Sequence, residues 1–191
     1  FKPIFMYEYL HRILGRIIGI IFFIPLLYFT LRKAIPPVLI PRLYLLLILG
    51  GFQGVLGWYM VKSGLVDDPN VSQYRLTAHL GMAVFIYSLI LWTVFDLSLN
   101  YNHAIRSRIK WMSSTLTLLI FLMILSGGLV AGTRAGIPFP TWPLMGDTFI
   151  PPQIYSMNPS WLSAFEDMAT IQFNHRMFAY LLTIFIVIFA I

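Results

Sequence analysis

The sequence predicts an all-α fold, a polytopic bundle of membrane-spanning helices, from three observations. Charged residues make up 10% of the 191 residues and hydrophobic residues 59%, whereas a soluble domain has roughly 25% and 45–50%. Uncharged apolar runs close to the ~20 residues that cross a bilayer as a helix recur along the chain. Lysine and arginine concentrate in alternate links between these runs. This composition excludes an ordinary cytosolic enzyme, and also a disordered chain, which needs low hydrophobicity.

The first span is built on residues 17–31, an uncharged stretch that extends backwards through Arg16, Arg12 and His11. Pro25 lies inside this span, and we expect a kink there because proline cannot donate the helical hydrogen bond. Neighbouring helices of a bundle satisfy a carbonyl freed in this way, so the proline is compatible with a membrane span.

The following spans are uncharged runs of similar length: 43–61, 76–95 and 111–133. A last apolar run, residues 177–191, continues to the final residue, so we expect a fifth span and an incomplete chain. Residues 134–170 contain no such run and are punctuated by proline, glycine and aromatic residues. Loops of this length are commonly functional, and we expect an interfacial lid with a short helix at residues 161–168, WLSAFEDM.

The charges in the links predict how the spans are oriented. The two basic links carry the following charged residues: Arg32, Lys33 and Arg42 in one, and Asp96, Arg106, Arg108 and Lys110 in the other. The other two links carry acids and bases in similar number. Because basic loops are retained on the inner side of a membrane, we expect the basic links on the cytoplasmic or matrix side. The N-terminus and the other two links then face the outer side.

Three of the four histidines lie near the outer end of a predicted span: His11, His79 and His175. The fourth lies in a basic link. Polar residues within a membrane are costly and are therefore functional-site candidates. Residues 8–12 read EYLHR and residues 172–176 read QFNHR, so an acid or amide precedes a His-Arg pair in both segments. This recurrence is typical of an internal duplication.

Histidines at a common depth in a helical bundle favour haem ligation, because two imidazoles on facing helices can take both axial positions of the iron. Arg12, Arg16 and Arg176 lie within a turn or two of these histidines and are candidates to bind haem propionates. The chain has no cysteine, which excludes iron–sulfur clusters and thiolate zinc sites. The residues leave one alternative open, in which each histidine only hydrogen-bonds a neighbouring helix.

Glycines at a spacing of four residues predict close helix packing. They form the pairs Gly15–Gly19, Gly50–Gly54, Gly128–Gly132 and Gly132–Gly136. A flat macrocycle between helices needs the same small residues, so this spacing does not distinguish packing from haem binding.

Longer motifs are similar to those of the haem A synthase family, in order and over nearly the whole chain. They are EYLHRILGR, GGFQGVLGWYMVKSGL, QYRLTAHLG, GGLVAGTRAG, TWPLMGDTFIP and QFNHRMFAY. The resemblance implies an eight-helix membrane protein made of two similar four-helix halves, of which this chain supplies the second to sixth helices. Residues 1–110 then form an N-terminal half-bundle without its first helix, with the substrate haem site. Residues 111–191 begin the C-terminal half-bundle, with a haem b site.

The resemblance also implies roles for individual residues. His11 and His79 resemble the histidine pair that binds the substrate haem O, and His175 resembles the first axial ligand of a haem b cofactor. Glu8 matches an acidic residue that handles protons or charge during the reaction. That reaction is the stepwise oxidation of a haem O methyl group to the formyl group of haem A, with an external electron donor and water as the oxygen source.

The same resemblance implies an integral protein of the bacterial or mitochondrial inner membrane, with the haem sites towards the outer side. Its partners would be the lipid bilayer, haem O synthase, cytochrome oxidase assembly factors and a second copy of the chain, but no nucleic acid. Two alternatives stay open. A bis-histidine haem b electron-transfer subunit needs only histidines and spans, whereas Glu8 beside His11 favours chemistry on a substrate. A transporter has its site near the midplane, whereas these histidines lie towards the outer ends.

Overall fold

The computed structural model describes residues 2–62, 71–99 and 107–190, and these residues form an all-α structure. The long helices are α1 (Lys2–Leu31), α2 (Ile40–Lys62), α3 (Gln73–Ser98), α4 (Ser107–Thr133) and α6 (Met168–Ala190). All five are long and apolar enough to cross a membrane. The predicted fold class and the five spans are therefore confirmed, whereas His103 and Arg106 lie outside the described residues.

Several helices are longer than the apolar runs that predicted them. The helix α1 begins at Lys2 and remains helical through Pro25. The helix α2 begins at Ile40, because Pro41 in its first turn has no N–H to satisfy and a backbone angle suited to a helix. The helix α4 begins at Ser107, a few residues before the boundary expected between the two half-bundles.

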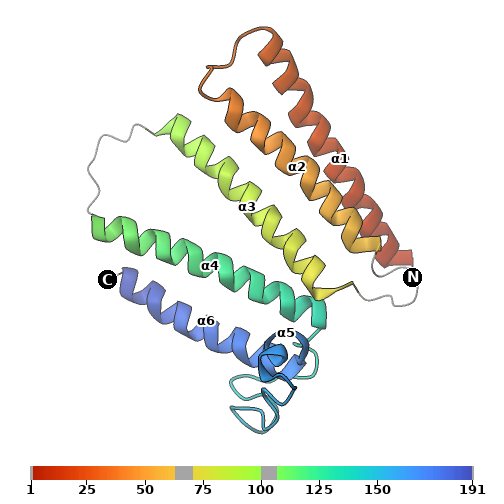
Figure 1. Cartoon of the computed structure of the whole chain (residues 1–191), viewed down its shortest axis with the longest axis vertical. Coiled ribbons are helices and arrows are strands. Elements are labelled where there is room, and N and C mark those ends of the chain that lie inside the picture. The colour runs from red at the N-terminus through yellow and green to blue at the C-terminus, as the bar shows by residue number, and fades with distance from the viewer. Residues whose placement is uncertain (1, 63–70, 100–106, 191) are drawn as a thin grey trace.

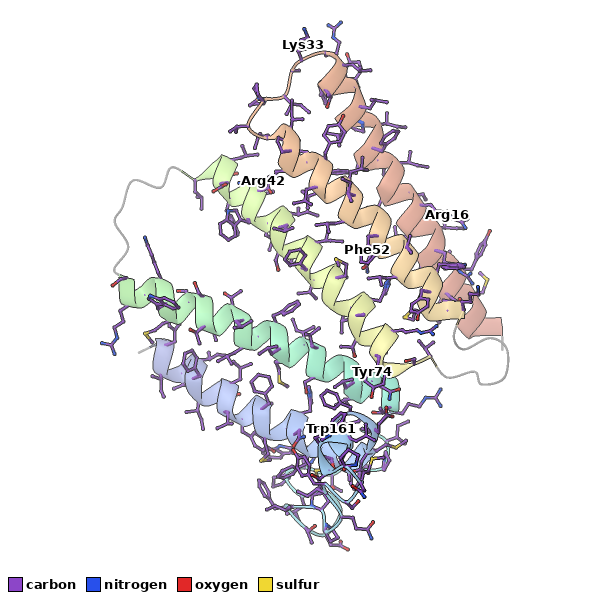
Figure 2. The ribbon with its side chains drawn as sticks, viewed as in Figure 1. Arg16, Lys33, Arg42, Phe52, Tyr74 and Trp161 are labelled. Carbon is purple, nitrogen blue, oxygen red and sulfur yellow. The ribbon has the colours of Figure 1, made fainter. Side chains whose placement is uncertain are left out.

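The long helices follow one another in space as they do in the chain, and each packs against the next (Figure 1). Their directions alternate, so the N-terminal ends of α1, α3 and α6 lie at the same end of the molecule as the C-terminal ends of α2 and α4. Side chains project outward from every long helix (Figure 2), and large apolar side chains such as Ile21 and Trp92 are exposed. Such surfaces suit lipid, where helix association does not depend on burying apolar area away from water.

Gly128 and Gly132 allow α3 and α4 to approach closely near the N-terminal end of α3. A Cβ atom at Gly132 would lie 2.5 Å from Cα of Gln73, and one at Gly128 would lie 2.8 Å from Oγ1 of Thr77. Both distances are shorter than real Cβ contacts, so the packing prediction is confirmed for this pair. The other predicted glycines have no described atom within 4 Å of such a Cβ: Gly15, Gly19, Gly50, Gly54 and Gly136.

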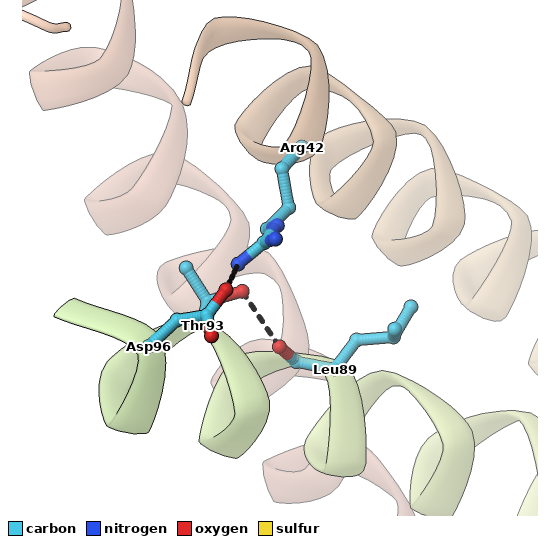
Figure 3. A network of polar contacts seen from close by, with 4 residues as sticks. All are labelled: Arg42, Leu89, Thr93 and Asp96. Atoms are coloured by element: carbon cyan, nitrogen blue, oxygen red, sulfur yellow. Dashed lines mark hydrogen bonds and ion pairs between the residues drawn. The ribbon is translucent and has the colours of Figure 1, made fainter. Parts of the chain in front are cut away.

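An ion pair joins α2 and α3 at the opposite end of the molecule (Figure 3). Nη1 of Arg42 lies 2.7 Å from Oδ2 of Asp96. One turn earlier on α3, the buried hydroxyl of Thr93 donates to the carbonyl of Leu89 at 2.7 Å, so it is satisfied within its own helix. Arg42 was predicted to lie in a basic link, and the structure places it in the first turn of α2.

The segment between α4 and α6 is folded. It contains a 3-10 turn, η1 (Ser160–Leu162), and a one-turn helix, α5 (Ser163–Glu166). The predicted short helix is thus confirmed in shortened form, because Asp167 adopts an extended conformation and ends it. The Asp167 carboxylate instead accepts hydrogen bonds from the N–H and hydroxyl of Thr170, at 2.8 and 2.6 Å, and caps the start of α6.

Further hydrogen bonds fasten this segment to α6. The N–H of Tyr155 donates to the fully buried Thr170 hydroxyl at 3.0 Å, and the Tyr155 hydroxyl donates to Asn174 Oδ1 at 3.0 Å. The N–H of Met157 donates to the fully buried Ser163 hydroxyl at 3.1 Å. The segment is therefore a cap on the N-terminal end of α6, and its position at a membrane interface stays a prediction.

Candidate functional site

The three predicted histidines lie towards the same end of the molecule. His11 belongs to α1, His79 to α3 and His175 to α6, each in the N-terminal half of its helix. Residues 12–31 and 80–98 follow the first two histidines to the ends of their helices. At ~1.5 Å per residue, roughly 30 Å of helix separates each of these histidines from the opposite end, which is about the thickness of a hydrocarbon core.

The structure brings His11 and His79 together, although they belong to helices that do not follow each other in the chain. Their ring centres lie 6.4 Å apart and their ring planes are at 81°. Metal–imidazole bonds are about 2 Å long, so two rings on opposite sides of one iron atom have their centres roughly 6 Å apart. The observed separation therefore fits a pair of axial ligands to a single iron.

Two residues of helix α2 pack against His79. A Cβ atom at Gly57 would lie 3.0 Å from Cε1 of His79, a tight contact that would push the ring from this position. Nε2 of Gln53 donates to the backbone carbonyl of His79 at 3.0 Å and lies 3.4 Å from the ring Nε2. Nδ1 of His79 is buried without a hydrogen-bond partner in the described part of the chain. An unpaired buried nitrogen costs free energy unless something binds it, which fits a ligand-binding role.

Arg75, one turn before His79, joins the N-terminal end of α3 to the C-terminal end of α2. Its Nη1 donates to the carbonyl of Tyr59 at 2.9 Å, and its guanidinium lies 3.8 Å from the centre of the Tyr59 ring. Lys62 similarly lies over the ring of Trp58, at 5.0 Å. These cation–π contacts fix the helix ends beside the histidine pair.

His175 likewise lies next to two residues of the neighbouring helix, α4. A Cβ atom at Gly127 would lie 3.5 Å from Cε1 of His175, and Oγ of Ser126 lies 3.0 Å from Nδ1 of the ring. The other ring nitrogen, Nε2, has no hydrogen-bond partner among the described residues. His175 can therefore bind a metal through Nε2 while Ser126 holds Nδ1.

The predicted acidic and basic residues of α1 form a compact group. The carboxylate of Glu8 pairs with Arg12, Oε1 to Nη2, at 2.7 Å. The side chain of Arg16 makes no ion pair with any residue that the structure describes (Figure 2). Tyr9, Arg12, Ile13 and Arg16 line a small cavity of about 280 Å³. Arg12 and Arg16 thus present cationic groups next to the His11 turn, as anionic propionates require.

Arg176, the third predicted basic residue, is engaged by the cap on α6. Its guanidinium donates to the carbonyls of Leu144 and Phe139 at 3.0 and 2.7 Å. With the Gln172 amide oxygen turned towards it, Gln172 accepts from Nη2 and Nε of Arg176 at 3.3 and 3.2 Å. The pair Gln172–Arg176 therefore has the same spacing on α6 as the pair Glu8–Arg12 on α1, in agreement with the repeated sequence frame.

Four residues that lie against the histidines were missed by reasoning from the sequence: Gln53, Gly57, Ser126 and Gly127. The carboxylate of Glu166 accepts hydrogen bonds from Gln73, at 2.9 Å, and from the Tyr74 hydroxyl, and so ties α5 to the start of α3. Gln53 and Ser126 had a detectable signal, because each is a polar residue within an apolar span. The two glycines gave none, because glycine spacing does not reveal which side chain packs on them.

The geometry fits haem better than a bare metal ion. Within the described ranges, no group of three or more histidine, cysteine or acidic side chains could hold a metal ion. A pair of axial histidines is sufficient for haem, because the porphyrin supplies the remaining ligands.

Comparison with known proteins decides the family. The model of the family described as cytochrome oxidase assembly protein matches residues 1–191. This chain belongs to that family. Several curated proteins that are similar to this chain are named heme A synthase. The protein of Nitrosospira multiformis is 50% identical over 99% of the chain and 54% of its own length.

Two further relatives carry the same name. The protein of Parvibaculum lavamentivorans is 46% identical over 98% of the chain and 54% of its own length. That of Wolbachia pipientis wMel is 38% identical over 100% of the chain and 55% of its own length. The family member described here therefore spans about half the length of the curated relatives it matches. No solved structure matches it significantly.

Proposed function

We propose that the chain is part of a membrane haem A synthase, an oxidoreductase that converts the methyl group of haem O to the formyl group of haem A for cytochrome oxidase biogenesis. The observation that carries this proposal is the close pair of His11 and His79, with ring centres 6.4 Å apart. Relatives named heme A synthase match nearly the whole chain, which supports the same function.

In this proposal His11 and His79 hold the substrate haem O from its two faces, and His175 binds a haem b cofactor. Haem O supplies the oxidisable methyl group, and haem b supplies an electron-transfer centre. Arg12 and Arg16 bind propionates at the substrate site. Arg176 acts indirectly, because its guanidinium is used by carbonyls of the cap that closes the start of α6.

Glu8 is proposed to take up protons during the oxidation. Converting a methyl to a formyl group with oxygen from water removes hydrogen as protons and electrons, so the site needs a proton acceptor. Glu8 lies one helical turn from His11 and is paired with Arg12 at 2.7 Å. This pair places a carboxylate beside the proposed substrate site.

The proposed setting is the inner membrane, bacterial or mitochondrial, with the haem sites towards the outer side; the bacterial relatives favour the bacterial membrane. Because oxygen from water leaves the substrate's electrons to be removed, an external electron acceptor, rather than a donor, completes the reaction. Haem O synthase, cytochrome oxidase assembly factors and a second copy of the protein are the expected macromolecular partners.

The test is to express the full-length protein together with haem O synthase, purify it and extract its pigments. Haem A synthase yields a formyl-bearing haem, identified by its mass and by its pyridine haemochrome spectrum. A bis-histidine electron-transfer subunit yields haem b alone, and that result would overturn the proposal.

A further inference from the structure

The inference concerns the polar atom that holds His175, and it rests on the function proposed above. Oγ of Ser126 on α4 lies 3.0 Å from Nδ1 of His175 on α6. Both side chains are partly buried, and α4 and α6 pack against each other along this interface. The hydroxyl therefore reaches the ring from a neighbouring helix and constrains its orientation.

The residue next to Ser126 also lies close to the His175 ring. Gly127 lies under the ring, where a Cβ atom would be 3.5 Å from Cε1 of His175. Ser126 thus contacts a nitrogen of the ring, and the backbone of Gly127 lies beside it. Because Nδ1 points towards Ser126, Nε2 lies on the other side of the ring, where no described residue hydrogen-bonds to it.

Binding of iron through Nε2 would determine whether Nδ1 donates or accepts in the hydrogen bond with Ser126. A neutral imidazole that binds metal through Nε2 carries its proton on Nδ1. In that tautomer Nδ1 donates to the Ser126 oxygen, so the hydroxyl stabilises the form of the ring that binds iron through Nε2. A hydrogen bond accepted from the outer nitrogen of a ligating histidine also fixes the ring and makes it a better electron donor to the metal.

The His79 site lacks this arrangement. Nδ1 of His79 is buried without a partner in the described part of the chain, and Gln53 approaches Nε2 at 3.4 Å, a long contact. The amide of Gln53 makes its shorter hydrogen bond, 3.0 Å, to the backbone carbonyl. His175 therefore has a side-chain hydrogen-bond partner at Nδ1, whereas His79 has none there among the described residues.

We propose that Ser126 is a positioning residue of the haem b site, which keeps His175 ready to bind iron through Nε2 and so favours a permanently bound cofactor there. The substrate site, where His79 has no such partner, is suited to a haem that exchanges. Ser126 touches neither haem nor reacting atoms in this proposal and acts only through His175.

The test uses the full-length protein, purified in detergent, with the substitutions Ser126→Ala, Ser126→Thr and His175→Ala. Ser113→Ala is the matched control on α4, because the Ser113 hydroxyl donates only to the carbonyl of Ile109 in its own helix, at 2.8 Å. The readouts are the haem b midpoint potential, the electron paramagnetic resonance spectrum of the ferric haem, and the rate of haem transfer to excess apo-globin.

Ser126→Ala is expected to release haem b about tenfold faster and to raise its midpoint potential, because the ring becomes a poorer donor to ferric iron. Ser126→Thr restores the hydroxyl and should restore both values, and Ser113→Ala should resemble the wild type. If Ser126→Ala matches Ser113→Ala while His175→Ala loses haem b, the positioning role is wrong and the haem site stands. If His175→Ala keeps its haem b, the proposed site is wrong as well.

Discussion

The imidazole rings of His11 and His79 lie edge to face with their centres 6.4 Å apart, although one is on α1 and the other on α3. Helix α2 lies between them in the chain and packs against both helices. Gly57 and Gln53 of α2 also contact His79 directly. The hairpin formed by α1 and α2 therefore positions the two histidines for a shared ligand.

Replacing the histidines should separate the two sites. His11→Ala or His79→Ala should abolish haem A formation and leave the haem b spectrum largely intact. The reason is that the His175 ring contacts a different helix, α4, through Ser126. His175→Ala should instead remove the haem b signal first. Absorbance spectra and pigment analysis of purified full-length variants measure both effects. Equal and mild losses from all three substitutions would mean that the histidines serve only in packing.

Replacing Glu8 should separate proton uptake from a structural role. Glu8→Gln keeps the size and polarity of the side chain but removes its charge, and we expect more than about a tenfold loss of turnover, roughly 1.4 kcal/mol, with haem still bound. Glu8→Asp is the matched variant, because it keeps a carboxylate and leaves Arg12 in place while it shortens the side chain that forms the 2.7 Å ion pair. The rate of haem A formation is measured for both. If Glu8→Gln loses no more activity than Glu8→Asp, the carboxylate has no role in proton uptake.

Two adjacent glycines on α4 should respond differently to an added methyl group. Gly128→Ala places a Cβ atom 2.8 Å from Oγ1 of Thr77, so α3 and α4 must move apart, at a cost of about 1–3 kcal/mol. Gly127→Ala meets its nearest neighbour, a ring atom of His175, at an ordinary 3.5 Å and should be tolerated. Thermal unfolding of the detergent-purified variants tests this. Similar melting temperatures for the two would show that the close approach of α3 and α4 is not needed.

The orientation of the helices can be tested with single cysteines, since the chain itself contains none. Lys33 and Asp147 are exposed at the two ends of the molecule, the first in the link after α1 and the second in the cap on α6. In intact cells, an impermeant thiol reagent should label Asp147→Cys, and should label Lys33→Cys only after the membrane is opened. Labelling of both cysteines in intact cells would overturn the predicted topology.

The spans could be predicted from the sequence because lipid imposes a simple requirement on each of them. A helix must be apolar over about 20 residues, and that requirement is visible without knowing any neighbour. The ends were less predictable. Arg42 belongs to α2, where its ion pair with Asp96 at 2.7 Å joins two helices that the sequence shows only as separate runs.

The histidines of the site were also predictable, because each is a costly polar residue at the end of an apolar run. The residues that pack against these histidines were not predictable. Gly15–Gly19 and Gly128–Gly132 have the same spacing, yet within the described residues only the second pair lies against another helix. Spacing identifies a small-residue face but not the helix that meets it.

Arg176 shows a second limit of the same kind. Its position one residue after His175 suggested a propionate ligand, whereas its guanidinium is bound by the carbonyls of Leu144 and Phe139. These acceptors belong to an irregular segment whose path follows no periodic pattern of residues. Contacts with such a segment depend on its folded path, which a single sequence does not reveal.

The most direct test of the central claim, that the His11–His79 pair holds haem O for oxidation, is the ratio of haem A to haem O in membranes. The full-length protein and its His79→Ala variant are each expressed with haem O synthase in cells that have no other haem A synthase, and the extracted haems are separated by chromatography. The wild type should form haem A, and the variant should accumulate haem O while it retains haem b. Absence of haem A from the wild type, or equal haem A in both, would contradict the account.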